Sequence, residues 1–220
     1  MALIFSPIFA GLYEKKQEIV KADIFISIKF FIYFFLTLPH LLIYSLSSNK
    51  KLVHADIERW RKVTRLKYSW YGSFIYFLMA HREFRNLFYY RVGGIMYILL
   101  NFILPKMNTL FIHTPPGKIG KGLFIHHGFA TIISAKEIGD NCWVNQQVTI
   151  GYTNDVDCPV LLNNVRVAAG AKVLGNICCG NNTVIGANAV VTKNVPDNCT
   201  VAGVPAYIIK RNGVSVKEPL

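Results

Sequence analysis

Residues 161–191, LLNNVRVAAGAKVLGNICCGNNTVIGANAVV, carry an apolar side chain at every sixth position. The residues in this register are Leu161, Val167, Val173, Cys179, Ile185 and Val191. Small or turn-forming residues such as Ala168, Gly180 and Gly186 follow them directly. This period is typical of hexapeptide repeats, in which each repeat forms one short strand and one tight corner, and three repeats close a coil of about eighteen residues. The spacing therefore predicts a mainly β domain, a parallel β-helix with the register residues inside.

Two other folds compete with the β-helix for this segment. An α-helix does not explain the period, because residues six apart do not stay on one face of a helix with 3.6 residues per turn, and Gly and Asn are poor helix formers. An ordinary β-sandwich with a coincidental sixfold spacing is the remaining alternative.

The same period extends upstream and is interrupted twice. The upstream residues predicted to point inward are Ile119, Ile125, Ile132, Ile138, Val144 and Ile150. One residue is added between Ile125 and Ile132, and the step from Ile150 to Leu161 is eleven residues. The longer step predicts a loop over residues 151–159 that leaves the prism. Loops on a rigid scaffold are where binding and catalysis concentrate, so both interruptions are candidate sites.

The charge is unevenly distributed along the chain. Residues 1–106 contain 15 Lys and Arg against 6 acidic residues, whereas residues 107–220 contain 9 against 6. We expect a basic, apolar α-helical region over residues 1–106, the β-helix over 107–212 and a C-terminal tail over 213–220. A membrane surface fits the basic region better than nucleic acid does, because no zinc-ligand spacing, RNP-like motif or basic helix accompanies it.

The apolar run from Ile24 to Leu46 is long enough to cross a bilayer if it is helical. Lys29 lies inside the run and Pro39 interrupts it, so an interfacial or re-entrant helix fits as well as a span. A helix buried against the rest of the N-terminal region, or against a partner subunit, is the third interpretation. Because the run does not resemble a signal peptide, we expect a cytoplasmic protein at the inner face of the plasma membrane. A second apolar stretch, residues 93–104, is too short to span and is expected in a core or at an interface.

Cysteine usage argues against a metal site. The five cysteines are Cys142, Cys158, Cys178, Cys179 and Cys199. They are odd in number, form no C-x-x-C pair and have no histidine at metal-ligand spacing. We therefore expect free thiols, a reducing compartment and no metal cofactor.

The adjacent His126 and His127 fall at the first interruption of the register. On extended backbone, adjacent side chains point to opposite faces, so at most one of the two histidines faces a given cleft. An imidazole titrates near neutral pH and is suited to take a proton from an alcohol that attacks an activated carbonyl. A purely structural histidine is the competing interpretation, but the position at a register break favours a catalytic one.

Five segments resemble, in order, motifs of the hexapeptide-repeat acyltransferases, specifically the serine acetyltransferase-like branch. They read GLFIHHGFATII, IGDNCWVNQQVTIG, AAGAKVLGNI, IGANAVVTKNVP and AGVPAYIIK, and the resemblance covers roughly residues 107–212. It implies a left-handed parallel β-helix, a homotrimer with acetyl-CoA lying between neighbouring prisms, and direct acetyl transfer without a covalent enzyme intermediate.

The resemblance also implies roles for individual residues. His127 matches the general base of that family. The positions that match the CoA groove and its nucleotide end are Gly151, Ala169, Ala187, Lys210 and Arg211.

Two departures from the family concern the acceptor. Serine acetyltransferases carry Asp before the catalytic histidine and Arg-His-Pro in the long loop, whereas this chain has His126 and Asp157-Cys158-Pro159. A carboxylate in the pocket would then lack its usual cation. The strand residues 111–114 also lack the acid that orients the histidine in the family.

These departures lead to three functional hypotheses. We assign His126, Asp157 and Cys158 to acceptor binding and expect O-acetylation of a saccharide, possibly lipid-linked, in capsule or exopolysaccharide assembly, since FRNLFYYR (residues 84–91) resembles sugar-acetylating homologues. The first alternative is serine O-acetylation in cysteine biosynthesis. The second is a trimeric scaffold without enzymatic activity.

Overall fold

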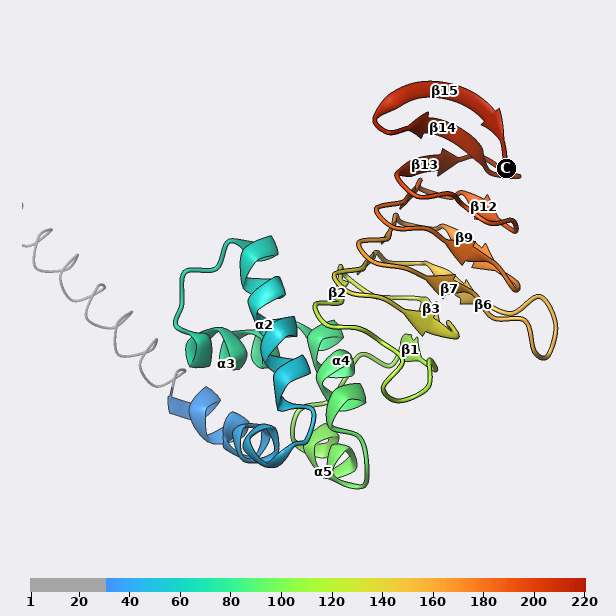
Figure 1. The fold of residues 1–220 in the computed structure, drawn as a ribbon. Coiled ribbons are helices and arrows are strands. Elements are labelled where there is room, and N and C mark those ends of the chain that lie inside the picture. Colours follow the sequence, from blue (N-terminus) through green and yellow to red (C-terminus); the bar gives the residue numbers. More distant parts are fainter. Residues whose placement is uncertain (1–30) are drawn as a thin grey trace, which may run out of the picture. The chain divides into compact units, whose positions relative to one another are not determined.

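The computed structural model describes residues 31–220, and residues 1–30 lie outside the described part of the chain. The beginning of the apolar run, residues 24–30, is therefore not tested. The chain divides into a first unit, Met1–Pro39, and a second unit, His40–Leu220. Residues 31–39 of the first unit are helical. The labelled elements all belong to the second unit (Figure 1).

The second unit opens with the predicted helical region. After the helical residues 40–46, its helices are α2 (Lys50–Thr64), α3 (Trp70–Ala80), α4 (Arg82–Val92) and α5 (Met96–Ile103). The Trp60 ring is central to an aromatic core, with its centroid 5.6 Å from that of Phe77 and 5.1 Å from that of Phe84. Within residues 31–220, no helix is long and apolar enough to cross a bilayer.

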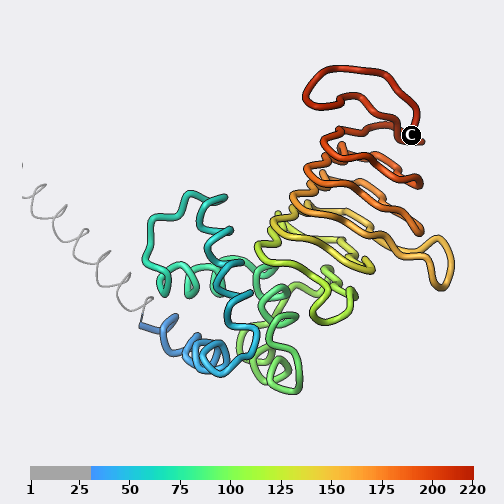
Figure 2. The backbone as a smooth tube through the Cα atoms, in the orientation of Figure 1, coloured from blue at the N-terminus to red at the C-terminus, as the bar shows by residue number. Residues whose placement is uncertain are grey.

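After the helices, the strands between residues 110 and 202 wind into a parallel β-helix with three faces (Figure 2). The first face contains β1 (Leu110–Ile112), β3 (Thr131–Ile133), β6 (Thr149–Gly151), β9 (Lys172–Leu174) and β12 (Val190–Val191). The second face contains β4 (Glu137–Ile138), β7 (Val160–Leu161) and β10 (Cys178–Cys179). The third face contains β2 (Phe124–Ile125), β5 (Trp143–Val144), β8 (Arg166–Val167), β11 (Val184–Ile185) and β13 (Cys199–Ala202).

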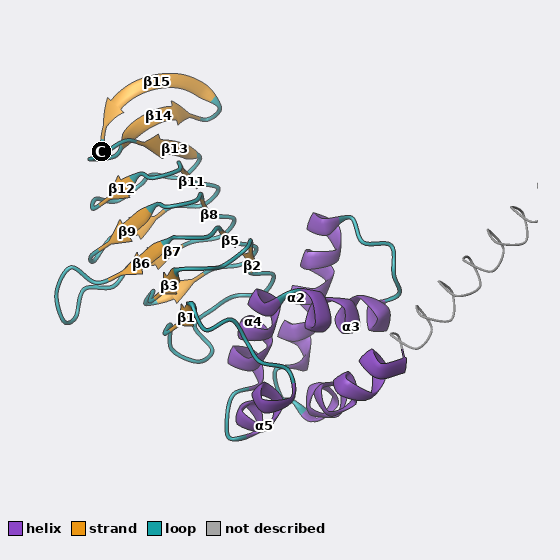
Figure 3. Ribbon diagram, turned by 180° about the vertical axis from the view of Figure 1, so that it is seen from behind, coloured by secondary structure: helices purple, strands orange, loops and turns teal. Residues whose placement is uncertain are grey.

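An antiparallel hairpin extends the third face at the C-terminal end of the prism. It consists of β14 (Tyr207–Arg211) and β15 (Val214–Pro219), and β14 pairs with β13 (Figure 3). The segment 213–220, expected to be a tail, therefore includes a strand.

The inward column confirms the hexapeptide prediction over residues 161–191, because all six register residues are 0 % exposed. The prediction for Ile132 is wrong. Its side chain is 39 % exposed, whereas Ile133 is fully buried and pairs with Ile150. The turn after Ile125 takes up one more residue than the spacing indicates, and a slip of one residue exchanges the two faces of a strand.

Asparagines hold successive coils in register at the corner between the second and third faces. Asn164, Asn182 and Asn198 have φ values of +59°, +58° and +56°, a left-handed conformation that asparagine tolerates well. Asn164 Nδ2 donates to Asn182 Oδ1 at 3.0 Å, and Asn182 Nδ2 donates to Asn198 Oδ1 at 2.9 Å. This side-chain ladder stabilises the coils that carry the sequence pattern.

A buried ion pair joins the helical region to the first coil. Arg91 of α4 donates from Nε to Asp56 Oδ2 of α2 at 2.8 Å, and both side chains are almost fully buried. Arg91 also donates to the carbonyl oxygens of Ile119 at 2.5 Å and Gly120 at 2.6 Å. Asp56 accepts from the Gly122 N–H at 2.7 Å. Because a buried charge that loses its partner costs about 3–5 kcal/mol, this network fixes α2 and α4 against the prism.

We expect Val173→Asp to prevent formation of folded protein, because it buries an unpaired carboxylate in the packed column. Lys172→Asp, at the neighbouring outward position, is the matched control and is expected to fold. Size-exclusion chromatography and circular dichroism of the two variants provide the measurement. A normally folded Val173→Asp protein would contradict the inward assignment.

Candidate active site

Two corners of the prism carry the residues that the sequence singles out. The histidine corner consists of the turns from the third face to the first, residues 126–130, 145–148, 168–171 and 186–189. The excursion corner consists of the turns from the first face to the second, residues 134–136, 152–159, 175–177 and 192–194. As predicted, the longest of these turns, 152–159, projects from the prism beyond β6 (Figure 1).

The predicted histidines lie in a tight turn directly after β2. The Gly128 N–H donates to the His126 carbonyl oxygen at 2.8 Å, and His127 between them has φ +64°. A bond from residue i+2 back to residue i around a left-handed central residue is the strained form of the γ-turn. Strain at a non-glycine residue clusters at functional sites, where the surrounding structure holds it in place.

The two imidazole rings stack instead of diverging. Their centroids are 3.9 Å apart, with an angle of 30° between the planes. The expectation that the side chains point to opposite faces is wrong, because the backbone at His127 is left-handed and not extended. His127 is exposed, whereas His126 is half-buried and its ring lies 5.9 Å from Phe124 and 5.7 Å from Trp143. His127 therefore faces solvent with His126 behind it.

The surroundings favour a neutral imidazole at His126. Burial is the main effect that lowers the pKa of His126, and His127 lowers it further. Arg166 and His81 act in the same direction, whereas Glu83 raises the pKa of His126. Since the net shift is downward, the ring is neutral at neutral pH, the form that accepts a proton.

The third face brings a cation to this corner. Trp143 and Arg166 are register partners on β5 and β8, and the Arg166 guanidinium lies 4.4 Å from the centroid of the Trp143 ring. Trp143 Nε1 donates to Asn145 Oδ1 at 2.5 Å, which fixes the indole under the guanidinium. Sequence reasoning missed Arg166. The available signal was its place directly before an inward valine, which points it outward.

The beginning of α4 brings a carboxylate to the same corner. Glu83 is 9 % exposed, and its Oε1 lies 3.0 Å from Nδ1 of His81. A Cβ added to Gly128 would lie 3.0 Å from the Glu83 Cβ, so the helix packs directly against the histidine turn. Sequence reasoning also missed Glu83, because no local pattern connects a helix start with a turn so far along the chain.

Two of the predicted CoA-binding positions share the histidine corner. Ala169 and Ala187 lie in its turns after β8 and β11, and the Asn188 N–H donates to the Ala169 carbonyl oxygen at 2.9 Å. The Val190 N–H donates to the Gly203 carbonyl oxygen at 3.0 Å, so the loop after β13 packs on β12.

The other predicted CoA-binding residues lie elsewhere. Gly151 ends β6 and leads into the excursion corner. Lys210 is exposed on β14. Arg211 donates from Nη2 to Glu218 Oε2 at 2.6 Å, which engages its guanidinium within the hairpin.

Asp157 and Cys158 lie at the excursion corner, and a single chain does not bring them to the histidines. They line a cavity of about 550 Å³ together with Lys136. Asn154 Nδ2 donates to Asp157 Oδ2 at 2.6 Å, and the Cys158 thiol donates to the Ser134 carbonyl oxygen at 2.7 Å. Both side chains are therefore held by their own loop and its neighbouring turn.

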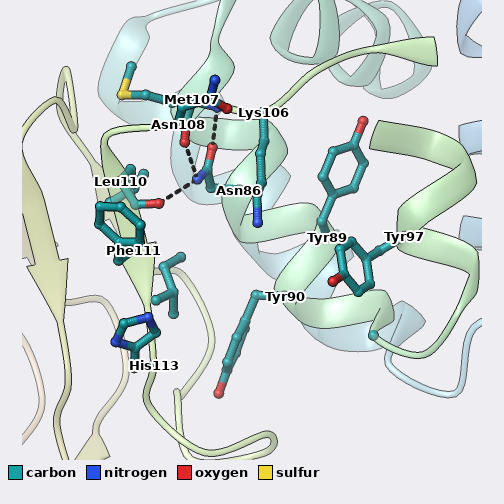
Figure 4. A pocket seen from close by; sticks show the side chains of 12 residues that line it. Asn86, Tyr89, Tyr90, Tyr97, Lys106, Met107, Asn108, Leu110, Phe111 and His113 are labelled. Atoms are coloured by element: carbon teal, nitrogen blue, oxygen red, sulfur yellow. Dashed lines mark hydrogen bonds between the residues drawn. The ribbon is translucent and has the colours of Figure 1, made fainter. Parts of the chain in front are cut away.

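A further cavity of about 370 Å³ lies between α4, α5 and β1 (Figure 4). Asn86 donates from Nδ2 to the carbonyl oxygens of Met107 at 3.0 Å and Leu110 at 2.9 Å. Tyr90 donates from its hydroxyl to the Pro115 carbonyl oxygen at 2.6 Å. These groups pin the connection into β1, so we assign them a structural role.

The thiols are free, and burial raises the pKa of Cys179 to about 12. Across residues 31–220, no group of three His, Cys, Asp or Glu side chains could hold a metal ion.

Comparison with known proteins shows that the chain is similar to serine acetyltransferases. No protein-family model matches the chain. A serine acetyltransferase of Synechococcus elongatus is 43 % identical over 147 residues, which cover 65 % of this chain and 59 % of that protein. The chain thus spans less than two thirds of this relative's length.

Solved structures of serine acetyltransferases have a similar fold. A soybean serine acetyltransferase apoenzyme has a TM-score of 0.60 at 27 % identity, covering 74 % of this chain and 69 % of that one. A serine acetyltransferase in complex with CoA has a TM-score of 0.59 at 28 % identity, covering 74 % and 70 % of the two chains.

Proposed function

We propose that this protein is an acetyl-CoA-dependent serine O-acetyltransferase. The observation that carries the proposal is the strained histidine turn, which continues along one corner into the small residues Ala169 and Ala187. A relative named serine acetyltransferase at 43 % identity and a similar structure in complex with CoA support the same chemistry.

The histidine turn performs general base catalysis in this proposal. His127 takes the proton of the acceptor hydroxyl as the oxygen attacks the thioester carbonyl. The imidazolium then returns this proton to the departing CoA thiolate, so the side chain ends in its starting form. His126 stacks on His127 and orders the ring that faces solvent.

The choice of serine as acceptor reverses the expectation from the sequence. The comparisons give no support to a saccharide acceptor. The argument against serine was the missing cation in the loop, but Arg166 holds a guanidinium close to His126 across Trp143. A carboxylate of the acceptor therefore has a cation at the histidine corner.

A homotrimer would complete the site. Asp157 and Cys158 lie at a different corner from His127 within one chain. A neighbouring prism with its excursion corner against the histidine corner would bring the three residues together and enclose a cosubstrate between subunits.

We also propose that the helical region docks on an anionic membrane surface. In α5 and the residue before it, the apolar side chains of Ile95, Leu99 and Phe102 are 71 %, 60 % and 89 % exposed. Residues 1–106 carry 15 Lys and Arg against 6 acidic residues, which complements anionic lipid. An exposed apolar helix face beside basic residues is typical of interfacial binding.

The first prediction of this proposal concerns the histidines. His127→Ala is expected to lower kcat by about 10² to 10⁴, because it removes the general base, and to leave folding and CoA binding close to wild type. His126→Ala should cost less. Steady-state kinetics and isothermal titration with CoA make the measurement. If His126→Ala is inactive and His127→Ala active, the roles of the two histidines are reversed.

The acceptor is tested by thiol release from acetyl-CoA with serine and a panel of sugars. We expect turnover with serine and none with the sugars. Turnover with a sugar alone would support the saccharide hypothesis, and no turnover with any acceptor by a folded trimer would support the scaffold.

Membrane docking is tested by co-sedimentation with vesicles that contain phosphatidylserine. The double substitution Leu99→Ser and Phe102→Ser should reduce binding, and salt should weaken wild-type binding because surface charges are screened within about 8 Å at physiological ionic strength. The control is Phe111→Ser, which changes an exposed apolar side chain of β1. Equal binding of both variants, or no binding of the wild type, would exclude this surface.

A further inference from the structure

A buried carboxylate lies against the histidine turn without a role in the function proposed above. Glu83 lies in the first turn of α4 and is 9 % exposed. Burial of a charged carboxylate is costly unless it is paired. In the described part of the chain its one ion-pair partner is His81, with Nδ1 at 3.0 Å from Glu83 Oε1. This position calls for a chemical explanation.

The packing leaves little freedom between Glu83 and the turn. A Cβ at Gly128 would meet the Glu83 Cβ at 3.0 Å and the side chains of Ile125 and Leu110 at 3.1 Å. Gly128 has φ +65°, so both the space and the backbone require glycine there. The first carbon of the Glu83 side chain is thus packed against the histidine turn, and its carboxylate is held by His81.

The charged neighbours of His126 shift its pKa in different directions. They come from its own turn (His127), from the start of α4 (Glu83, His81) and from β8 (Arg166). Among these described groups, Glu83 is the one carboxylate, and the others oppose a positive charge on the ring. The charge of Glu83 also raises the pKa of Arg85 on its own helix, where burial lowers it.

The strand β1 does not provide a carboxylate for the histidine turn. Residues 111–114, which approach the turn through β1 and β3, contain no acidic side chain. A histidine that takes a proton becomes an imidazolium, which needs a nearby negative charge in a partly dry site. The start of α4 brings a carboxylate to this corner from a different element.

We propose that Glu83 is a positioning residue of the histidine pair: its carboxylate, held by His81, acts on the His126 ring, which stacks on the general base His127 and orders it. The inference rests on the acyl transfer proposed above. The proton moves from the acceptor hydroxyl to the His127 imidazole and then to the CoA thiolate, and Glu83 takes no part in the transfer. It touches neither acceptor nor cosubstrate.

The first test does not depend on activity. The His126 ring is titrated by NMR in the wild type, in Glu83→Gln and in the control Glu58→Gln, which removes a helical carboxylate paired with Arg61 at 2.8 Å. Loss of the negative charge should move the His126 midpoint to lower pH by about one pH unit. The control should leave it unchanged. An unchanged midpoint in Glu83→Gln overturns the proposal whatever the acceptor proves to be.

The second test uses steady-state kinetics with acetyl-CoA. Glu83→Gln should lower kcat by about 10- to 100-fold and keep KM for acetyl-CoA, because the His126 ring that orders the base loses its nearby carboxylate. Glu83→Asp keeps the charge and should restore part of kcat and of the His126 midpoint. A merely structural role would lower the melting temperature and leave the His126 midpoint in place, and that result would overturn the proposal.

Discussion

The buried pair of Asp56 and Arg91 is the constraint on which the arrangement of this protein depends. Each partner also bonds to the backbone of the first coil, at Gly122, Ile119 and Gly120. The helical region is therefore attached to the prism through directional, desolvated hydrogen bonds and not only through apolar contact. Because Arg91 lies in the last turn of α4 and Glu83 in its first turn, the same pair determines where the start of α4 meets the histidine turn.

The sixfold spacing predicted the inward residues of the regular coils, but it did not place the residues that follow an irregular turn. The inward column from Leu161 to Val191 follows from a sixfold period that no other regular structure shares, and it is fully buried. The exchange of Ile132 for Ile133 was beyond a spacing argument, since the strained turn before them absorbs an extra residue. Periodicity reports regular coils and cannot place the residues of an irregular turn.

The site shows the same division. His126 and His127 were found because they interrupt the register, and the loop over residues 152–159 because it lengthens a step. Glu83 and Arg166 reach the histidines only through tertiary contact, from a helix start and from a later coil. Both residues are far from the histidines along the chain, and the stacking of coils and the packing of α4 bring them together. A local sequence pattern does not show this.

The asparagine ladder bears on the length of a ligand that would lie along the prism axis. It joins coils whose strands are parallel and in register, so each coil adds one inter-strand spacing of about 4.8 Å along the prism axis. The number of coils between His127 and Gly203 therefore sets the distance between them along the prism axis. A molecule must have at least this length to touch both. Insertion or loss of one whole coil would change that length by a single step and leave the chemistry of the histidine turn as it is.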